Sequence, residues 1–269
     1  MRRLGLTMAV TLLLGGGLVG AAPGGASAAG ARYLQPTTEI KQARGCIKLA
    51  PGFNGVKVRM VQRRLGLGSR WETMDSTTVA AVRRFQKRHD LRRRDGVVNR
   101  GTWRAMGFKA GFCLDRWQAK PALPLDATRR QRINTMLRFA NNYRGAEYVW
   151  GGAGRPKRGV DCSGLVLQAL YRAGLDPQPI TIDRHVRPFY RTSYNLYHHD
   201  ELRRVRRANM RRGDLIFYTK DSTGRINHVA LYLGRGRMLE AKGSNVHRTR
   251  VREHYPDQTI APKVVRPFN

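Results

Sequence analysis

The sequence predicts an α+β protein in two parts: a small three-helix domain, then a domain in which helices pack on an antiparallel sheet. Apolar residues recur with helical spacing through much of the chain, and β-rich runs gather after residue 214. Helices followed by antiparallel strands are typical of the α+β class. The 269 residues leave room for one large or two modest domains.

The N-terminus has the pattern of a secretory signal peptide. Arg2 and Arg3 precede an apolar stretch over residues 4–19, and a small-residue cleavage motif ends at Ala28. The stretch is short for a membrane span and is diluted by glycines, although an uncleaved anchor is the alternative. We therefore expect residues 1–28 to be removed, the protein to be secreted, and no stable membrane insertion to remain.

The chain is strongly basic, with a net charge of +33. Such a charge favours an anionic partner, which could be nucleic acid, an acidic membrane or a wall polymer. Export of the protein from the cell argues against nucleic acid as its partner. The basic run over residues 203–212 is interpreted as a solvated face, not as a catalytic feature.

The protein has three cysteines, which would lie in an oxidising compartment after export. Cys46 and Cys113 bracket a compact segment, and we expect them to form a disulfide. That pairing leaves Cys162 odd, and an odd thiol in a secreted protein is a candidate reactive group. The alternative for Cys162 is a buried apolar filler.

Residues 45–114 are predicted to form the helical domain, with Ser76 or Thr77 capping its second helix and a turn at residues 95–96. Three short helices make a marginal core, which a disulfide would reinforce. The apolar positions that define the helices are Val58, Val61, Leu65, Val82, Phe85, Thr102, Trp103 and Met106.

Two prolines mark residues 115–127 as a semi-rigid linker, and residues 128–269 are expected to form the second domain. A helix capped by Thr128 should begin it, and another should run from Cys162 to Arg172. Strands are predicted at residues 215–218, 229–233 and 238–241.

The run around Cys162 suggests nucleophilic chemistry. Asp161 is well placed as an N-cap, so Cys162 would occupy the first turn of a helix. There the helix dipole and free N–H groups favour an anion, and with a nearby imidazolium they would lower the pKa of the thiol. The same N–H groups could hold an oxyanion.

His228 is the best candidate for the base. It begins a strand, and a short turn after Gly234 would put Glu240 diagonal to it on the same sheet face. A carboxylate there would orient the imidazole. The alternatives are a structural histidine and a solvated glutamate. The other histidines are expected at the surface, and the absence of metal-ligand spacing predicts no metal and no cofactor.

The first segment resembles a three-helix peptidoglycan-binding domain. The resemblance lies in residues 58–65, residues 81–86, and residues 95–98 followed by Thr102 and Trp103. The family often carries an Asp-Gly turn before the second helix, where this sequence has residues 71–75, so glycan recognition through that loop is in doubt. The alternative is a spacer bundle without a ligand.

Residues 130–269 resemble the NlpC/P60 family of papain-like cysteine peptidases. The resemblance lies in four runs, at residues 148–152, 161–164, 212–217 and 227–230. It implies cleavage of peptidoglycan stem peptides, typically between D-glutamate and diaminopimelate, by a wall-associated enzyme. By the same resemblance Cys162 is the nucleophile, His228 the base and Glu240 the third member, while Tyr148, Asp161 and Ser163 help to hold the substrate.

Two other functions remain open from the sequence. An amidase of the same fold would cut the link between glycan and peptide, and a non-catalytic protein would only bind the wall. The residues of the nucleophile turn favour the endopeptidase. Peptidoglycan and anionic wall polymers are the expected partners, and a monomer is the expected state.

Overall fold

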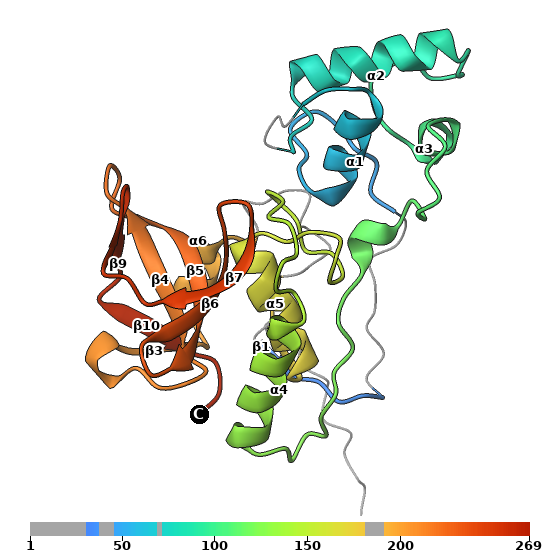
Figure 1. The fold of residues 1–269 in the computed structure, drawn as a ribbon. Helices are drawn as coiled ribbons and strands as arrows, with labels where there is room; N and C mark the ends of the chain where they lie inside the picture. The colour runs from blue at the N-terminus through green and yellow to red at the C-terminus, as the bar shows by residue number, and fades with distance from the viewer. Residues whose placement is uncertain (1–30, 38–45, 69–71, 181–190) are drawn as a thin grey trace, which may run out of the picture.

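The computed structural model describes residues 31–37, 46–68, 72–180 and 191–269, which form a small helical domain beside a larger α+β domain (Figure 1). The expected signal peptide at residues 1–28 lies outside the described residues. Within the described ranges, no helix is long and apolar enough to cross a membrane.

The helical domain buries one apolar face of each of its helices. Val58 and Val82, one from each of the first two helices, are fully buried against Trp103 of the third. The cap of the second helix is Asp75, whose carboxylate accepts the N–H of Thr78, so the expectation of Ser76 or Thr77 was wrong by one residue. The helices are α1 (Val56–Arg64), α2 (Ser76–Arg88), α3 (Arg100–Ala105) and the short 3₁₀ helix η1 (Leu114–Arg116).

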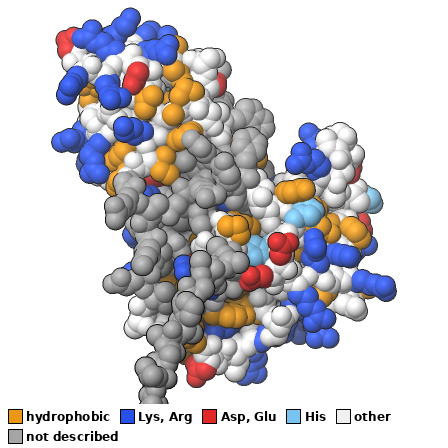
Figure 2. All heavy atoms as spheres, turned by 180° about the vertical axis from the view of Figure 1, so that it is seen from behind, with side chains coloured by type: hydrophobic (Ala, Val, Ile, Leu, Met, Phe, Trp, Pro, Cys, Tyr) orange, Lys and Arg blue, Asp and Glu red, His pale blue; other side chains and the backbone are white. Residues whose placement is uncertain are grey.

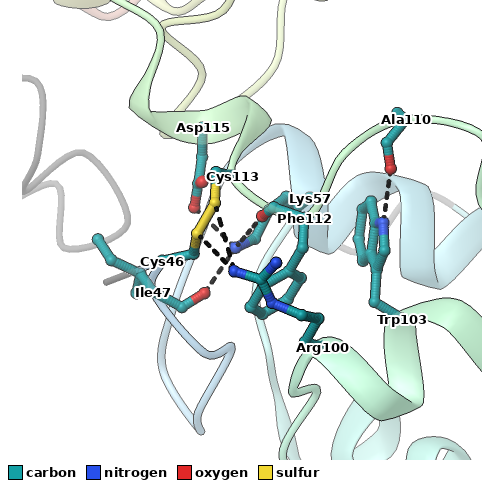
Figure 3. Close-up of a disulfide and its surroundings, with 9 residues drawn as sticks. All are labelled: Cys46, Ile47, Lys57, Arg100, Trp103, Ala110, Phe112, Cys113 and Asp115. Carbon is teal, nitrogen blue, oxygen red and sulfur yellow. Dashed lines mark hydrogen bonds and ion pairs between the residues drawn. A yellow bond between two sulfur atoms is a disulfide. The ribbon is translucent and has the colours of Figure 1, made fainter. Parts of the chain in front are cut away.

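A disulfide between Cys46 and Cys113 closes this domain (Figure 3). Closing a loop of 67 residues stabilises the folded chain by about 4 kcal/mol in the chain-entropy view. Beside the disulfide, the buried ammonium of Lys57 lies 2.9 Å from a carboxylate oxygen of Asp115. Burial lowers the pKa of Lys57 and the Asp115 charge opposes that shift. The disulfide joins the start of the domain to its end, and the ion pair joins α1 to η1.

The described part of the segment before the helical domain contains a strand. Residues Ala31–Tyr33 form strand β1, which pairs antiparallel with β2 (Leu175–Pro177) of the second domain. Arg32 makes an ion pair with the buried carboxylate of Asp176, and the guanidinium of Arg132 lies over the Tyr33 ring. These are contacts between distant parts of the sequence, which local patterns do not reveal.

The second domain packs two long helices on one face of an antiparallel sheet (Figure 1). Among the described residues the main strand order is β3-β10-β4-β5-β6-β7, with β9 beside β4 and β8 beside β9. The larger core lies between the helices and the sheet, where Leu165 and Val166 meet Val229 and Leu231. The helices are α4 (Arg129–Asn141), α5 (Cys162–Arg172), α6 (Ser193–Tyr197) and the 3₁₀ helix η4 (Arg207–Asn209); the strands are β3 (Arg203–Arg206), β4 (Leu215–Lys220), β5 (Arg225–Gly234), β6 (Arg237–Lys242), β7 (Asn245–Arg250), β8 (His254–Tyr255), β9 (Gln258–Ile260) and β10 (Lys263–Arg266).

The expected linker runs along the second domain. The N–H of Ala119 donates to the side chain of Gln168 at 2.8 Å, and the N–H of Ala122 donates to the Arg172 carbonyl at 3.0 Å. Arg132 donates to the carbonyl oxygens of Pro124 and Leu125. Hydrogen bonds to α4 and α5 therefore fix this segment, and the domain boundaries at residues 45, 114 and 128 stay predictions.

Candidate active site

The turn that presents the cysteine lies at the N-terminus of α5. Asp161 caps this helix, because its carboxylate accepts the N–H of Gly164 at 2.6 Å. Cys162 is therefore the first helical residue. A Cβ at Gly164 would lie only 2.1 Å from the carbonyl oxygen of Gly152, so the turn can pack this tightly only with glycine there.

Arg191 holds the same turn and was not predicted. Its guanidinium donates to both oxygens of Asp161 at 2.8 Å and to the Ser163 hydroxyl at 2.9 Å, and the side chain is fully buried. The Asp161 carboxylate also accepts the N–H of Gly151 at 3.0 Å. Through these contacts Asp161 fixes the turn. Asp161 and Ser163 both border a cavity beside Cys162, and their expected contact with the substrate stays a prediction.

Burial dominates the electrostatics of Cys162. The residue is only 6% exposed, and burial raises the pKa of its thiol to about 12, helped by the Asp161 charge. Backbone N–H groups of Val229 and Ser163 donate to the sulfur and partly oppose this rise. The N–H of Ser163, at the helix terminus, lowers the pKa as expected, but the expected net lowering was wrong because burial outweighs this contribution.

The imidazole of His228 and the carboxylate of Glu240 form a buried pair. His228 Nε2 lies 2.6 Å from Glu240 Oε2, and the two side chains are 4% and 1% exposed. The pair depends on the hairpin register, in which Leu231 of β5 faces Leu239 of β6. Extending that register by one residue brings Glu240 to the diagonal position expected from the sequence.

The charges of this pair are set by burial and by its partners. Burial lowers the pKa of His228 below its usual range, and Glu240 opposes that shift. Burial alone would raise the pKa of Glu240, but hydrogen bonds from His228 and Tyr255 leave it lowered. At neutral pH, Glu240 is thus a carboxylate beside a neutral imidazole.

Two further residues contact Glu240 and escaped the sequence analysis. The Tyr255 hydroxyl donates to Glu240 Oε1 at 2.6 Å, and Nε2 of His247 lies 3.4 Å from the same oxygen. His247 lies at the surface as expected, with a 42% exposed side chain. The expectation was wrong for His199, which is buried with Nε2 2.8 Å from the Gln178 carbonyl oxygen. His185 lies outside the described residues. Tyr255 and His247 come from strands whose packing the local sequence does not specify.

Two cavities meet at Cys162. The first cavity has a volume of about 770 Å³ and is bordered by Tyr148, Cys162 and His228. The second cavity has a volume of about 470 Å³ and shares Trp150, Cys162 and Asn227 with the first. Burial and the nearby Cys162 raise the pKa of Tyr148, so its hydroxyl stays protonated. Cys162 therefore borders a cavity on each side of it.

No group of three or more His, Cys, Asp or Glu side chains among the described residues is arranged to hold a metal ion. A cysteine at the N-terminus of α5, with a histidine on the strand packed against that helix, is the papain-like arrangement in an α+β domain. Residues 145–264 match the NlpC/P60 family, so this domain belongs to that family. Residues 54–106 match the family described as "Putative peptidoglycan binding domain".

Several known proteins are similar to part of this chain. The peptidoglycan endopeptidase RipB of Mycobacterium tuberculosis (strain H37Rv) is 39% identical over 129 residues, 44% of this chain and 46% of that protein. The murein DD-endopeptidase MepH of Escherichia coli K12 is 33% identical over 113 residues, 41% of this chain and 37% of that protein. The solved structure of RipD of M. tuberculosis, described as a non-catalytic NlpC/p60 domain protein, is 29% identical over 51% of this chain and 97% of that one, with a TM-score of 0.38. The chain spans less than half the length of the curated relatives RipB and MepH.

Proposed function

We propose that the protein is a secreted, wall-associated hydrolase that cleaves peptidoglycan stem peptides with Cys162 as nucleophile. The observation that carries the proposal is the buried His228–Glu240 pair, 2.6 Å apart, whose His228 borders the same cavity as Cys162. A nucleophile, a base and an orienting carboxylate are the parts that thiol acyl transfer needs. Membership of the second domain in the NlpC/P60 family supports the same reading.

In the resting enzyme the thiol is protonated and the imidazole is neutral, because both groups are buried. If Nε2–H of His228 donates to Glu240, the other ring nitrogen, Nδ1, is free to accept the thiol proton. Proton transfer then accompanies attack of the sulfur on the carbonyl carbon. The N–H donors of Val229 and Ser163 stabilise the negative charge that develops on the sulfur.

Attack forms a tetrahedral intermediate. When the peptide bond breaks, His228 returns the proton to the leaving amine and a thioester remains on Cys162. Water, deprotonated by the same imidazole, hydrolyses the thioester and restores the thiol. Glu240 stabilises the imidazolium that forms in each half of the cycle. Tyr148, at the edge of the cavity, would assist the oxyanion or shape the site.

The bond we propose is the one between D-glutamate and diaminopimelate, which the family resemblance implies. RipB is named as an endopeptidase and MepH as a DD-endopeptidase, so the family name alone does not fix the bond. An amidase acting at the glycan–peptide link is the second candidate. A protein that only binds the wall is the third, and the intact Cys162, His228 and Glu240 argue against it.

The helical domain is proposed to hold the enzyme at the wall. Lys and Arg side chains gather over this domain in Figure 2, and α2 exposes Arg83, Arg84, Lys87 and Arg88. A cationic surface of this kind attracts anionic wall polymers. We propose that residues 45–114 bind the wall, that residues 115–127 connect the domains, and that the protein acts as a monomer.

The test is mass spectrometry of peptidoglycan fragments after incubation with the protein and, in parallel, with a Cys162→Ala variant. New ends between D-glutamate and diaminopimelate, absent with the variant, are the expected result. Different ends that also need Cys162 would favour the amidase. Walls that are bound but uncut by both proteins would contradict the proposed hydrolase.

A further inference from the structure

The first cavity has walls from both domains. Tyr148, Cys162 and His228 border it from the second domain, while Arg59 of α1 and Glu72 border it from the helical domain. Attachment to the wall alone does not require the helical domain to contribute residues to the cavity that contains the nucleophile. The contacts at this border show what the helical domain contributes.

Glu72 joins the two domains through its carboxylate. One oxygen accepts the backbone N–H of Trp150 at 3.1 Å, and the other accepts from the Arg59 guanidinium at 2.6 Å. Arg59 in turn pairs with Glu147 of the second domain, which Arg63 also contacts at 2.9 Å. Glu72 is only 5% exposed, so these partners take the place of water around its carboxylate.

The backbone on both sides of this contact is shaped for close approach. Glu72 has a φ of 45°, in the left-handed region that non-glycine residues rarely adopt. Opposite it, Gly151 has a φ of 71°, and a Cβ there would lie 2.7 Å from Cβ of Asn54 in the helical domain. The two surfaces therefore meet at positions that few other residues could occupy.

The contact continues to the nucleophile in two steps. The N–H of Gly151, next to Trp150, donates to Asp161 at 3.0 Å, and the N–H of Asp161 donates to the Gly152 carbonyl at 2.8 Å. Asp161 caps α5, at whose first position Cys162 stands. A shift of the segment over residues 150–152 would thus move the turn that carries the sulfur. Glu72 also lies in the stretch over residues 71–75 that departs from the usual peptidoglycan-binding pattern.

We propose that Glu72 is a positioning residue for Cys162 and that the helical domain forms part of the catalytic cleft, in addition to any wall binding. This proposal rests on the proposed peptidase function. Cleavage of a short soluble stem peptide, with no glycan for the helical domain to bind, should therefore still depend on Glu72.

The experiment measures kcat and KM on a soluble stem peptide for Glu72→Gln, Glu72→Ala and the control Asp90→Asn. Asp90 is an exposed acid of the same domain, and its carboxylate pairs with Arg94 on the surface. We expect kcat to fall by at least about tenfold in Glu72→Ala with a smaller change in KM, because a misplaced nucleophile slows the chemical step. Glu72→Gln, which keeps an oxygen for the Trp150 N–H, should retain more activity, and Asp90→Asn should match the wild type.

Thermal unfolding of each variant separates this effect from loss of fold. The rate at which iodoacetamide alkylates Cys162 gives a readout that needs no turnover, and Glu72→Ala should change it while Asp90→Asn does not. Equal peptide turnover and equal alkylation in wild type and a folded Glu72→Ala would overturn the proposal. A wild type that cleaves no substrate, with alkylation still sensitive to Glu72, would instead contradict the peptidase function and leave the positioning contact standing.

Discussion

Arg191 binds both carboxylate oxygens of Asp161, each at 2.8 Å, from a position 30 residues further along the chain. Through Asp161 it fixes the helix cap that precedes Cys162, and through the Ser163 hydroxyl it fixes the residue that follows. The arrangement of the nucleophile turn thus depends on a distant arginine with no solvent exposure.

Arg191→Met should destabilise the fold strongly. It leaves the buried Asp161 carboxylate without its charged partner, which typically costs about 3–5 kcal/mol. Urea unfolding measures the loss, with Arg206→Ala as control, because Arg206 is exposed on β3 and should change stability by less than about 0.5 kcal/mol. Equal urea midpoints for the two variants would show that the Arg191 contact does not contribute this much to the free energy of unfolding.

The pH dependence of kcat/KM should report His228. Since burial lowers its pKa, the imidazole stays neutral and competent as a base to below pH 6.5, and the acid limb of the profile should lie below that value. Glu240→Gln removes the group that raises this pKa, so the limb should move further down while kcat falls by roughly 10²-fold or more. An acid limb that moves up in Glu240→Gln would refute the assigned pairing.

Alkylation of Cys162 by iodoacetamide should be slow at pH 7 and should keep rising beyond pH 9. The reason is the raised pKa of about 12, which leaves little thiolate at neutral pH. A small-molecule thiol measured in parallel gives the reference curve, which levels off near its own pKa. A plateau for the protein below pH 8 would mean that the resting site holds a thiolate.

Gly164→Ala should lower both stability and activity. The added Cβ would fall 2.1 Å from the Gly152 carbonyl oxygen, so backbone must move, at a cost of about 1–3 kcal/mol. Gly111→Ala is the matched control, because a Cβ there meets nothing within 4 Å. Thermal unfolding and peptide turnover check both, and a Gly164→Ala protein as stable and active as the control would argue against the tight packing.

Binding to purified walls should weaken as salt rises. The Cys162→Ala protein, which should leave the walls intact, can be sedimented with them at about 50 and 500 mM NaCl, since salt screens charges on the protein surface. Replacing Arg84 and Arg88 of α2 with Gln should reduce binding mainly at low salt. Binding that is unchanged across this range would exclude electrostatic retention.

The sequence predicted those parts of the site that depend on local structure. The cap and the apolar spacing of α5 both lie in one short stretch of sequence. The predicted bounds of this helix, Cys162 to Arg172, are those observed. The placement of Glu240 beside His228 followed from a single hairpin register. Neither required knowledge of how distant segments pack.

What the sequence missed depends on tertiary contacts. Arg191 is one of 51 basic residues, and nothing near it marks it as the partner of Asp161. Tyr255 and Glu72 contact the site from segments that are distant in the sequence and come close only in the folded protein. The raised pKa of Cys162 belongs to the same group, because burial is a property of the packed molecule and not of a motif.

The pairing of β1 with β2 has a consequence for how the protein can move. The chain leaves the second domain at β1, passes through the helical domain, and returns along the segment before α4, so the helical domain is anchored to its neighbour at both ends. A module held by one end sweeps a broad volume, whereas one held by two ends is confined to small rotations about the line between its anchors. Cutting the chain once, just after β1, would remove one of these anchors and leave the helical domain held by the segment before α4 and by the contacts of Glu72 and Arg59 with the second domain.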